Sequence, residues 1–408
     1  MYGPATVVAE PVAAPPVPEG TLLGTAPPML EYATAAALLD VTTTTFLYGR
    51  DASRRWAPAS LTKLVTIYTA LDAADGGEVD FRAPQPVHPN AYASAVPPGS
   101  SLMFLGPGQV VGGVDLLRGL VVSSGNDAAV EVAMRVSGSV GAFNARMNEV
   151  AHRLGFDQFY FEDPAGLSAA NRITAAGISL FAVDLIERWP WLLDEVFSLT
   201  EFTYPQPRNY PDGWPGGAIR QFNRNGLVGS FDGADGLKTG FIEESGYNIV
   251  ATAERGGRRL VAVILGVQAD SHQEGSRRRD ADAAALLEWG FRSYEVVTVG
   301  APQPDPVRVW GTRTDEVMPV VAELPPISVP AGTVGRITGS IEQDRDRWAP
   351  LSAGDTVGQV RYSLDGTVLE EVPLTIPEDV PEGSAIRRLF DRVRWWLAGF
   401  FGDRPSAA

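Results

Sequence analysis

The chain has 408 residues, of which 45% are hydrophobic and 20% are charged, so it can bury at least one large core, and its length predicts two or three domains. The net charge of −16 argues against nucleic acid as a partner, because phosphate groups would be repelled. The absence of cysteine excludes disulfides, thiolate nucleophiles and cysteine-ligated metal sites. No apolar run approaches the roughly 18 residues of a membrane-spanning helix.

The first segment reads as a linker. Residues 4–20 are rich in proline and alanine, and the first basic side chain is Arg50. A signal peptide needs a basic start and an apolar run, and the stretch has neither, although it resembles the spacer that often follows one. We expect a linker over residues 1–27. Either an exporting segment has been removed or the protein is cytoplasmic.

Residues 28–295 alternate between strand-like and helical patterns, which predicts a mixed α/β (α+β) domain. Strands are expected at both ends of this stretch and helices in its middle. The expected elements are a hairpin over 35–48, helices over 60–73, 115–135, 140–154 and 280–292, and strands over 246–253 and 259–267.

Beyond a proline-rich joint at Ala301–Pro306, the chain consists of short β-prone runs. The Asp365-Gly366 pair is the turn that two-residue hairpins favour, and it joins two of these runs. We therefore expect a small all-β domain over residues 296–378.

The tail, residues 385–402, is predicted to form an amphipathic helix. Its net charge between residues 386 and 404 is +3, whereas the rest of the chain carries −19. A basic helix rich in Trp and Phe on an acidic protein is typical of an interfacial membrane anchor. The alternative is a helix that docks its apolar stripe on the body of the protein. The apolar positions at helical spacing are Ile386, Leu389, Phe390, Val393, Trp396, Leu397 and Phe400.

Lysine occurs only twice among the 33 basic residues, at Lys63 and Lys238. Arginine can replace lysine wherever a surface charge suffices, but its guanidinium does not lose a proton in proteins. Because the chain uses arginine almost everywhere else, the two retained lysines are predicted to have a chemical role.

Both lysines lie in short motifs with catalytic meaning. In the first, Ser60 precedes Lys63 by three positions, so on a helix a neutral amine can take the proton of the serine hydroxyl. The second is Lys238-Thr239-Gly240, which suits a substrate with a carboxylate. Between them, Ser124 can relay a proton, and the amide of Asn126 can hold a substrate carbonyl. Each motif alone is weak, but the ordered set S-x-x-K, S-x-N, K-T-G is strong.

The chain resembles the low-molecular-mass penicillin-binding proteins, which are serine-type D-alanyl-D-alanine carboxypeptidases, over about residues 28–401. The resemblance includes the β-rich region and the tail helix. The matching segments are PASLTKL (58–64), LLRGLVVSSGNDAA (116–129), FNARMNEVAHRLGF (143–156), NRN (223–225), DGLKTG (235–240), SGYNIVATA (245–253) and APLSAGDTVGQV (349–360).

This resemblance implies a five-stranded antiparallel sheet packed with helices beside a helical subdomain. It also implies that Ser60 is the acylated nucleophile and Lys63 its general base, with Ser124 and Asn126 on the opposite wall of the cleft.

The resemblance assigns the substrate carboxylate to the K-T-G motif. Lys238 and Thr239 would bind it, Gly240 would let it approach, and the backbone N–H groups of Ser60 and Phe241 would form the oxyanion hole. The implied partners are peptidoglycan stem peptides, β-lactam antibiotics and a membrane surface. The implied location is extracytoplasmic, and no metal or other cofactor is expected.

Three departures from the family pattern concern the substrate more than the reaction. After the K-T-G motif the chain has Phe241-Ile242, whereas relatives commonly have a hydroxyl residue at the second of these two positions. The segment DPAGL (163–167) lacks a histidine before its glycine. Gln268 stands where some members carry an arginine. The run Arg277–Arg279 is expected to be a solvated helix start.

Two other functions remain open. A β-lactamase would need a carboxylate that activates the deacylating water, and the sequence offers no convincing candidate. A non-catalytic penicillin sensor would gain nothing from the Ser60–Lys63 pair. The three histidines, at positions 88, 152 and 272, are too widely spaced to predict a zinc site.

Overall fold

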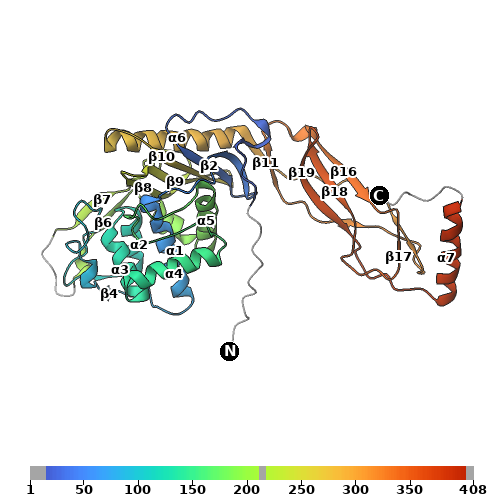
Figure 1. Cartoon of the computed structure of the whole chain (residues 1–408), viewed down its shortest axis with the longest axis horizontal. Helices are drawn as coiled ribbons and strands as arrows, with labels where there is room; N and C mark the ends of the chain where they lie inside the picture. Colours follow the sequence, from blue (N-terminus) through green and yellow to red (C-terminus); the bar gives the residue numbers. More distant parts are fainter. Residues whose placement is uncertain (1–14, 211–216, 401–408) are drawn as a thin grey trace. The chain divides into compact units, whose positions relative to one another are not determined.

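The computed structural model describes residues 15–210 and 217–400, with side chains up to residue 397 (Figure 1). The first 14 residues of the expected linker therefore lie outside the described residues, as do the last two of the expected tail helix. The chain forms two compact units, Met1–Tyr294 and Glu295–Ala408. No helix in the described ranges is long and apolar enough to cross a membrane.

The first unit is built on an antiparallel sheet with the strand order β1-β3-β2-β10-β9-β8. The expected hairpins are present, and β1 adds a two-residue sixth strand to the five long ones. The strands are β1 (Gly20–Thr21), β2 (Ala35–Asp40), β3 (Thr45–Arg50), β8 (Ala234–Ile242), β9 (Gly246–Arg255) and β10 (Arg258–Val267). Since β8 is the last strand, one of its sides is a free sheet edge.

Both faces of this sheet are buried. On β10, Val261 and Val263 point into one hydrophobic cluster, whereas Leu260 and Ile264 point into the other, as the two-residue period of a strand requires. Helix α6 (His272–Ser293) covers one face, and α5 (Ala175–Arg188) covers the other (Figure 1). Central strands of this sheet are therefore almost wholly apolar.

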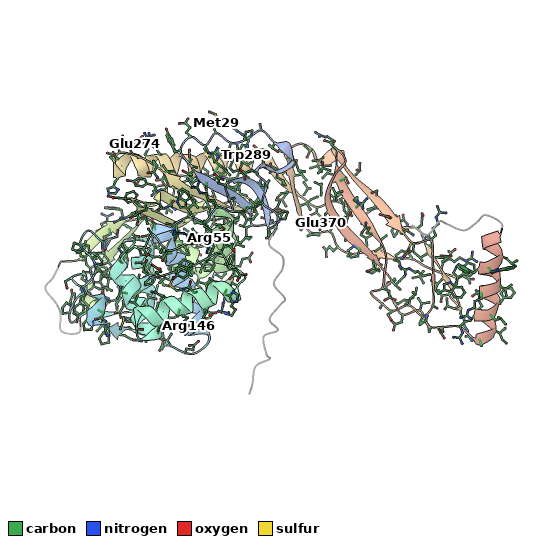
Figure 2. All side chains as sticks on the ribbon, in the orientation of Figure 1. Met29, Arg55, Arg146, Glu274, Trp289 and Glu370 are labelled. Carbon is green, nitrogen blue, oxygen red and sulfur yellow. The ribbon has the colours of Figure 1, made fainter. Side chains whose placement is uncertain are left out.

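Figure 2 shows the side chains along α6. Trp289, near the end of the helix, packs edge-on against Tyr48 of β3, whereas Glu274, in the first turn, pairs with arginines on its own helix. The sequence predicted a helix only over 280–292. The observed start at His272 is set by Ser271, whose hydroxyl accepts the N–H of Glu274 as an N-cap.

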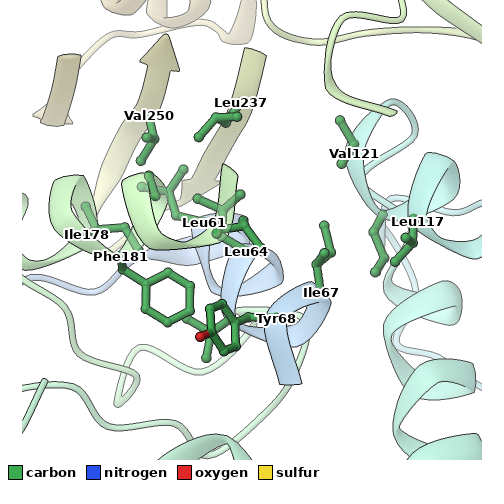
Figure 3. Packing of buried hydrophobic residues seen from close by; sticks show 14 of the residues in the cluster. Leu61, Leu64, Ile67, Tyr68, Leu117, Val121, Ile178, Phe181, Leu237 and Val250 are labelled. Atoms are coloured by element: carbon green, nitrogen blue, oxygen red, sulfur yellow. The ribbon is translucent and has the colours of Figure 1, made fainter. Parts of the chain in front are cut away.

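The helical subdomain lies on the α5 side of the sheet. Its central helix, α1 (Thr62–Asp75), is buried nearly all round and packs through Leu64 and Tyr68 against Phe181 of α5 (Figure 3). The other helices are α2 (Gly113–Val121), α3 (Asn126–Ser137) and α4 (Val140–Arg153). One continuous helix over 115–135 was therefore a wrong prediction: residues 122–125 break it, and Ser124 has a positive φ of 55°.

Shorter elements complete the first unit. They are η1 (Leu22–Gly24), η2 (Ala59–Leu61), η3 (Pro89–Ala91), η4 (Leu193–Phe197), η5 (Pro207–Asn209), and the strand pairs β4 (Gln85–Pro86) with β5 (Val110–Val111) and β6 (Glu201–Tyr204) with β7 (Ile219–Phe222).

The second unit is mainly β-structure around its own small hydrophobic core. The Asp365-Gly366 turn joins β18 to β19, as predicted. The sheets are β14-β19-β18-β16, β13-β12-β17 and β11-β15. Their strands are β11 (Tyr294–Val297), β12 (Val307–Trp310), β13 (Glu316–Val317), β14 (Val320–Val321), β15 (Ile327–Pro330), β16 (Ile337–Gln343), β17 (Asp346–Trp348), β18 (Thr356–Leu364) and β19 (Thr367–Thr375), and η6 (Val334–Arg336) precedes β16. The predicted α+β fold class is confirmed.

The last helix, α7 (Ala385–Phe400), belongs to the second unit and contacts its β-structure through polar side chains and through Trp395, which packs edge-on against Trp348. Asp391 is 1% exposed and accepts the backbone N–H of Gly311 at 3.0 Å, and Arg387 bridges Asp391 and Asp315. The apolar stripe is not the docked face, because its described side chains are exposed. They are Ile386, Leu389, Phe390, Val393, Trp396 and Leu397.

Candidate active site

Ser60 lies in a tight turn at the head of α1. The residue before it, Ala59, has a positive φ of 50°. A Cβ atom on Gly240 would lie 2.8 Å from the carbonyl oxygen of Pro58 and 2.9 Å from the nitrogen of Ser60, and one on Gly166 would collide with the carbonyl of Ala59. Two glycines from distant segments therefore let β8 and the 163–168 loop close around the Ser60 backbone.

The Lys63 ammonium lies one helical turn after Ser60 and is fully buried. Its Nζ is 3.0 Å from Ser60 Oγ and donates to Asn126 Oδ1 at 2.8 Å and to the carbonyl of Ala165 at 2.7 Å. These three oxygens fix the amine beside the serine. Burial lowers the pKa of Lys63 from its ordinary value of 10.5 to about 7; the negative charge of Asp163 opposes this shift and the positive charge of Arg224 adds to it.

Ser124 and Asn126 reach the site because α2 and α3 are separated there. Asn126 is the first residue of α3, and the adjacent Asp127 accepts the backbone N–H groups of Met103 and Phe104, each at 2.8 Å. Burial raises the pKa of Asp127, although these N–H bonds oppose the rise. The carboxylate thus ties the 103–105 segment to the start of α3.

Lys238 approaches from the opposite side. Its side chain is 1% exposed, and its Nζ donates to Ser124 Oγ at 3.1 Å and to the carbonyl of Thr239 at 2.8 Å. Burial holds the pKa of Lys238 well below its ordinary value, and the charges of Lys63, Arg224 and Arg279 lower it further. The two lysines of the chain therefore share one site, each bonded to a residue of the S-x-N motif.

Thr239, Gly240 and Phe241 follow on the free edge strand β8. Thr239 is buried, whereas Phe241 is 36% exposed. An edge strand can pair with an extended peptide through its backbone. The structure thus brings together all eight residues that the sequence singled out.

The DPAGL loop is held by Asp163. This carboxylate accepts the backbone N–H groups of residues 165–168. Ala165, which stands where the sequence analysis noted the missing histidine, contributes its carbonyl to Lys63. The departure therefore leaves the Lys63 environment complete.

Sequence reasoning missed two cations of this site, Arg224 and Arg279. Arg279 is 3% exposed, so its assignment to a solvated helix start was wrong. Its Nη2 donates to the backbone carbonyl of Arg224 at 2.9 Å. Extending the buried spacing of α6 backward from Leu286 through Asp282 would have placed Arg279 on the inner face.

The matches to known proteins cover nearly the whole chain. Residues 24–269 match the D-alanyl-D-alanine carboxypeptidase family, and residues 291–382 match the C-terminal domain of penicillin-binding protein 5. The chain belongs to the D-alanyl-D-alanine carboxypeptidase family. It is therefore a serine-type peptidase, as its sequence predicted.

Individual relatives agree with this assignment. The chain is 34% identical to the D-alanyl-D-alanine carboxypeptidase DacC of Escherichia coli over 91% of this chain and 90% of that protein. It superposes on penicillin-binding protein 5 of Haemophilus influenzae with a TM-score of 0.74 at 29% identity, over 88% of this chain and all of the other. Penicillin-binding protein D2 of Listeria monocytogenes in its ampicillin-bound form has a TM-score of 0.54 at 28% identity, over 65% of this chain and 99% of that one.

In the part of the chain that the structure describes, no group of three or more His, Asp or Glu side chains could hold a metal ion.

Proposed function

We propose that the chain removes the terminal D-alanine from peptidoglycan stem peptides through an acyl-enzyme on Ser60. The neutral amine of Lys63 takes the hydroxyl proton as Ser60 Oγ attacks the carbonyl carbon of the last peptide bond. The backbone N–H groups of Ser60 and Phe241 stabilise the developing oxyanion. The carbon–nitrogen bond then breaks, D-alanine leaves with the proton, and water hydrolyses the ester.

We assign the substrate carboxylate to the cationic side of the site. Lys238 and Thr239 bind it, Gly240 lets β8 lie against the Ser60 backbone, and Arg279 adds a second positive charge. Ser124 bonds to Lys238 and Asn126 to Lys63, so the S-x-N motif connects the proton-transfer side with the carboxylate side. Asn126 also offers its amide to the substrate backbone.

The observation that carries this proposal is the 3.0 Å contact between Lys63 Nζ and Ser60 Oγ, together with the lowered pKa of that amine. A lysine that is neutral in about half of the molecules at pH 7 can act as a general base.

The test is covalent labelling by a fluorescent penicillin and release of D-alanine from a soluble diacyl-D-alanyl-D-alanine peptide. Ser60→Ala should abolish both, whereas Ser293→Ala, at the end of α6 in the same unit, should retain both. Labelling of the Ser60→Ala protein at wild-type stoichiometry would contradict the assignment.

A β-lactamase or a non-catalytic sensor would differ in how the acyl group leaves. The carboxylate of Asp163 is taken up by four backbone N–H groups, which disfavours it as an activator of the deacylating water. We therefore expect slow release of penicillin but repeated turnover of the peptide. Rapid penicillin turnover would favour the lactamase, and labelling without peptide turnover would favour the sensor.

We propose four segments: a linker over 1–27, the peptidase domain over 28–295, a β-rich domain over 296–378, and the amphipathic helix over 385–402. The matched families and the division at Glu295 support the two central segments.

We propose that α7 binds the surface of a membrane and that the protein works outside the cytoplasm. The exposed apolar stripe supports this, because burying it in a bilayer interface is worth several kcal/mol at about 25 cal/mol per Å². Arginines beside the stripe add roughly 1 kcal/mol each near anionic lipid, and the remainder of the chain, at −19, would be repelled.

Deleting residues 385–408 should release the protein from anionic vesicles and leave peptide hydrolysis unchanged. Salt should weaken the binding of the intact chain without abolishing it, because salt screens only the charges. Equal co-sedimentation of the intact and truncated chains would rule out the anchor.

A further inference from the structure

Phe241 presents an aromatic surface beside the carboxylate-binding motif. The ring stacks on Tyr247 of the neighbouring strand, with centroids 4.3 Å apart and an angle of 29° between the planes. The two residues are direct cross-strand partners in the β8–β9 register. The outer part of the Phe241 side chain is left open to solvent, at 36% exposure, on an otherwise buried stretch of strand.

Other residues hold the Phe241 ring in place on the side away from solvent. His272 contacts it edge-on at 4.8 Å, and the hydroxyl of Tyr247 is hydrogen-bonded to His272 Nδ1 at 2.8 Å. Gly275 on α6 makes room for Tyr247, because a Cβ atom at that position would collide with the tyrosine ring. The orientation of Phe241 is therefore fixed by three residues from β9 and α6, so its exposed surface is preorganised.

The position of the ring relates it to one particular part of the substrate. Side chains two residues apart on a strand share a face, so Phe241 lies on the same face as Thr239. The charge of Arg279 acts on residues of both groups: it opposes the rise that burial causes in the pKa of Tyr247, and it adds to the lowering that burial causes in the pKa of Lys238. The substrate carboxylate that we assign to Lys238, Thr239 and Arg279 belongs to the last residue of the peptide. We therefore place the side chain of that last residue beside the ring.

We infer that Phe241 forms an apolar wall for the side chain of the C-terminal residue, and that the enzyme also releases D-amino acids with larger apolar side chains, such as D-leucine. This rests on the proposed function. The reaction is the same hydrolysis, in which Ser60 replaces the leaving amine and water then replaces Ser60. A methyl group covers little of an aromatic ring, whereas an isobutyl group can cover much more of it.

The experiment compares kcat/KM for two soluble peptides, diacyl-D-alanyl-D-alanine and diacyl-D-alanyl-D-leucine. The ratio of the two constants is the readout, since any loss common to both substrates cancels. We expect Phe241→Ala to lower the leucine-to-alanine ratio by about tenfold, the usual size of a lost apolar contact in a specificity pocket. Phe241→Tyr, which retains a ring, should keep the ratio. Phe390→Ala, an exposed phenylalanine of α7, is the matched control.

The outcomes are distinct. A ratio that stays within twofold of wild type in Phe241→Ala overturns the inference and leaves a ring that only packs on Tyr247. The same holds if wild type hydrolyses the alanine peptide but not the leucine peptide. If wild type hydrolyses neither peptide, the proposed function fails first, and the inference falls with it.

Discussion

The buried amine of Lys63 predicts how acylation depends on pH. An ordinary lysine, with a pKa of 10.5, would be neutral in about one molecule in three thousand at pH 7, whereas a pKa of about 7 makes about half of the molecules reactive. The neutral fraction is then about one tenth at pH 6 and about nine tenths at pH 8. The second-order rate constant for acylation of Ser60 by a β-lactam should therefore rise about tenfold over this interval.

Arg224 allows the cause of that midpoint to be tested. Its positive charge lowers the pKa of Lys63, and its side chain is exposed, so it can be replaced without opening the core. Arg224→Gln removes a cation that disfavours the ammonium form, and the midpoint should move to higher pH. Arg153→Gln, on α4, removes an exposed arginine of the same unit and should leave the midpoint in place.

The assay is stopped-flow acylation with a chromogenic β-lactam from pH 5.5 to 9.5 at constant ionic strength. A rate constant that does not change between pH 6 and 8, or a midpoint above pH 9, would refute the role of Lys63 as the base. A midpoint that moves to lower pH in Arg224→Gln would refute the electrostatic explanation.

Three further results are expected. Lys63→Arg should slow acylation by a factor of about 100 or more, whereas Lys238→Arg keeps a cation for the carboxylate and should cost less; equal losses in acylation kinetics would contradict this division. Gly166→Ala should lower acylation strongly, because its Cβ collides with Ala59 beside Ser60, and penicillin labelling measures the loss. Between about pH 7 and 10.5 the unfolded chain binds the Lys63 proton more readily than the folded one, so stability rises with pH. In urea unfolding, the free energy of unfolding of wild type should therefore rise by about 1.4 kcal/mol per pH unit relative to that of Lys63→Met. A difference between the two proteins that does not change with pH would contradict the lowered pKa of Lys63.

The sequence was sufficient for the fold class because helix and strand patterns are local, and the eight candidate site residues could be proposed because they lie in three short motifs. The Ser60–Lys63 spacing is set by one helical turn. Strand β10 has an unbroken apolar run over residues 260–265, and the Gly256-Gly257 turn separates it from β9. The break between α2 and α3 was missed, although Ser123-Ser124-Gly125 interrupts the apolar spacing just before Asn126, the first residue of α3. What ends α2 is the backbone of Ser124, whose positive φ is held by contacts to distant segments.

The two arginines were missed for a related reason. Arg279 lies among charged residues typical of a solvated helix start, and this composition concealed the spacing from Leu286 and Asp282 that puts it on the inner face. The apolar stripe of α7 was recognised from its spacing, but its orientation was not determined by that spacing. The buried carboxylate of Asp391 and its bond to Gly311 turn the polar side of the helix toward the β-structure.

The two lysines of the chain differ in what the site requires of them, because only the residue at position 63 has to lose a proton. Lys63 and Lys238 are both buried, and the charge of Lys63 lowers the pKa of Lys238. A buried cation without a paired anion is costly, and two near each other are more so. Lysine relieves this cost by giving up a proton, and the form it then takes is the base that Ser60 needs. An arginine at position 63 would remain charged and could not act as the base. The same burial and charge repulsion that make two nearby ammonium groups unfavourable therefore produce the neutral amine that Ser60 needs.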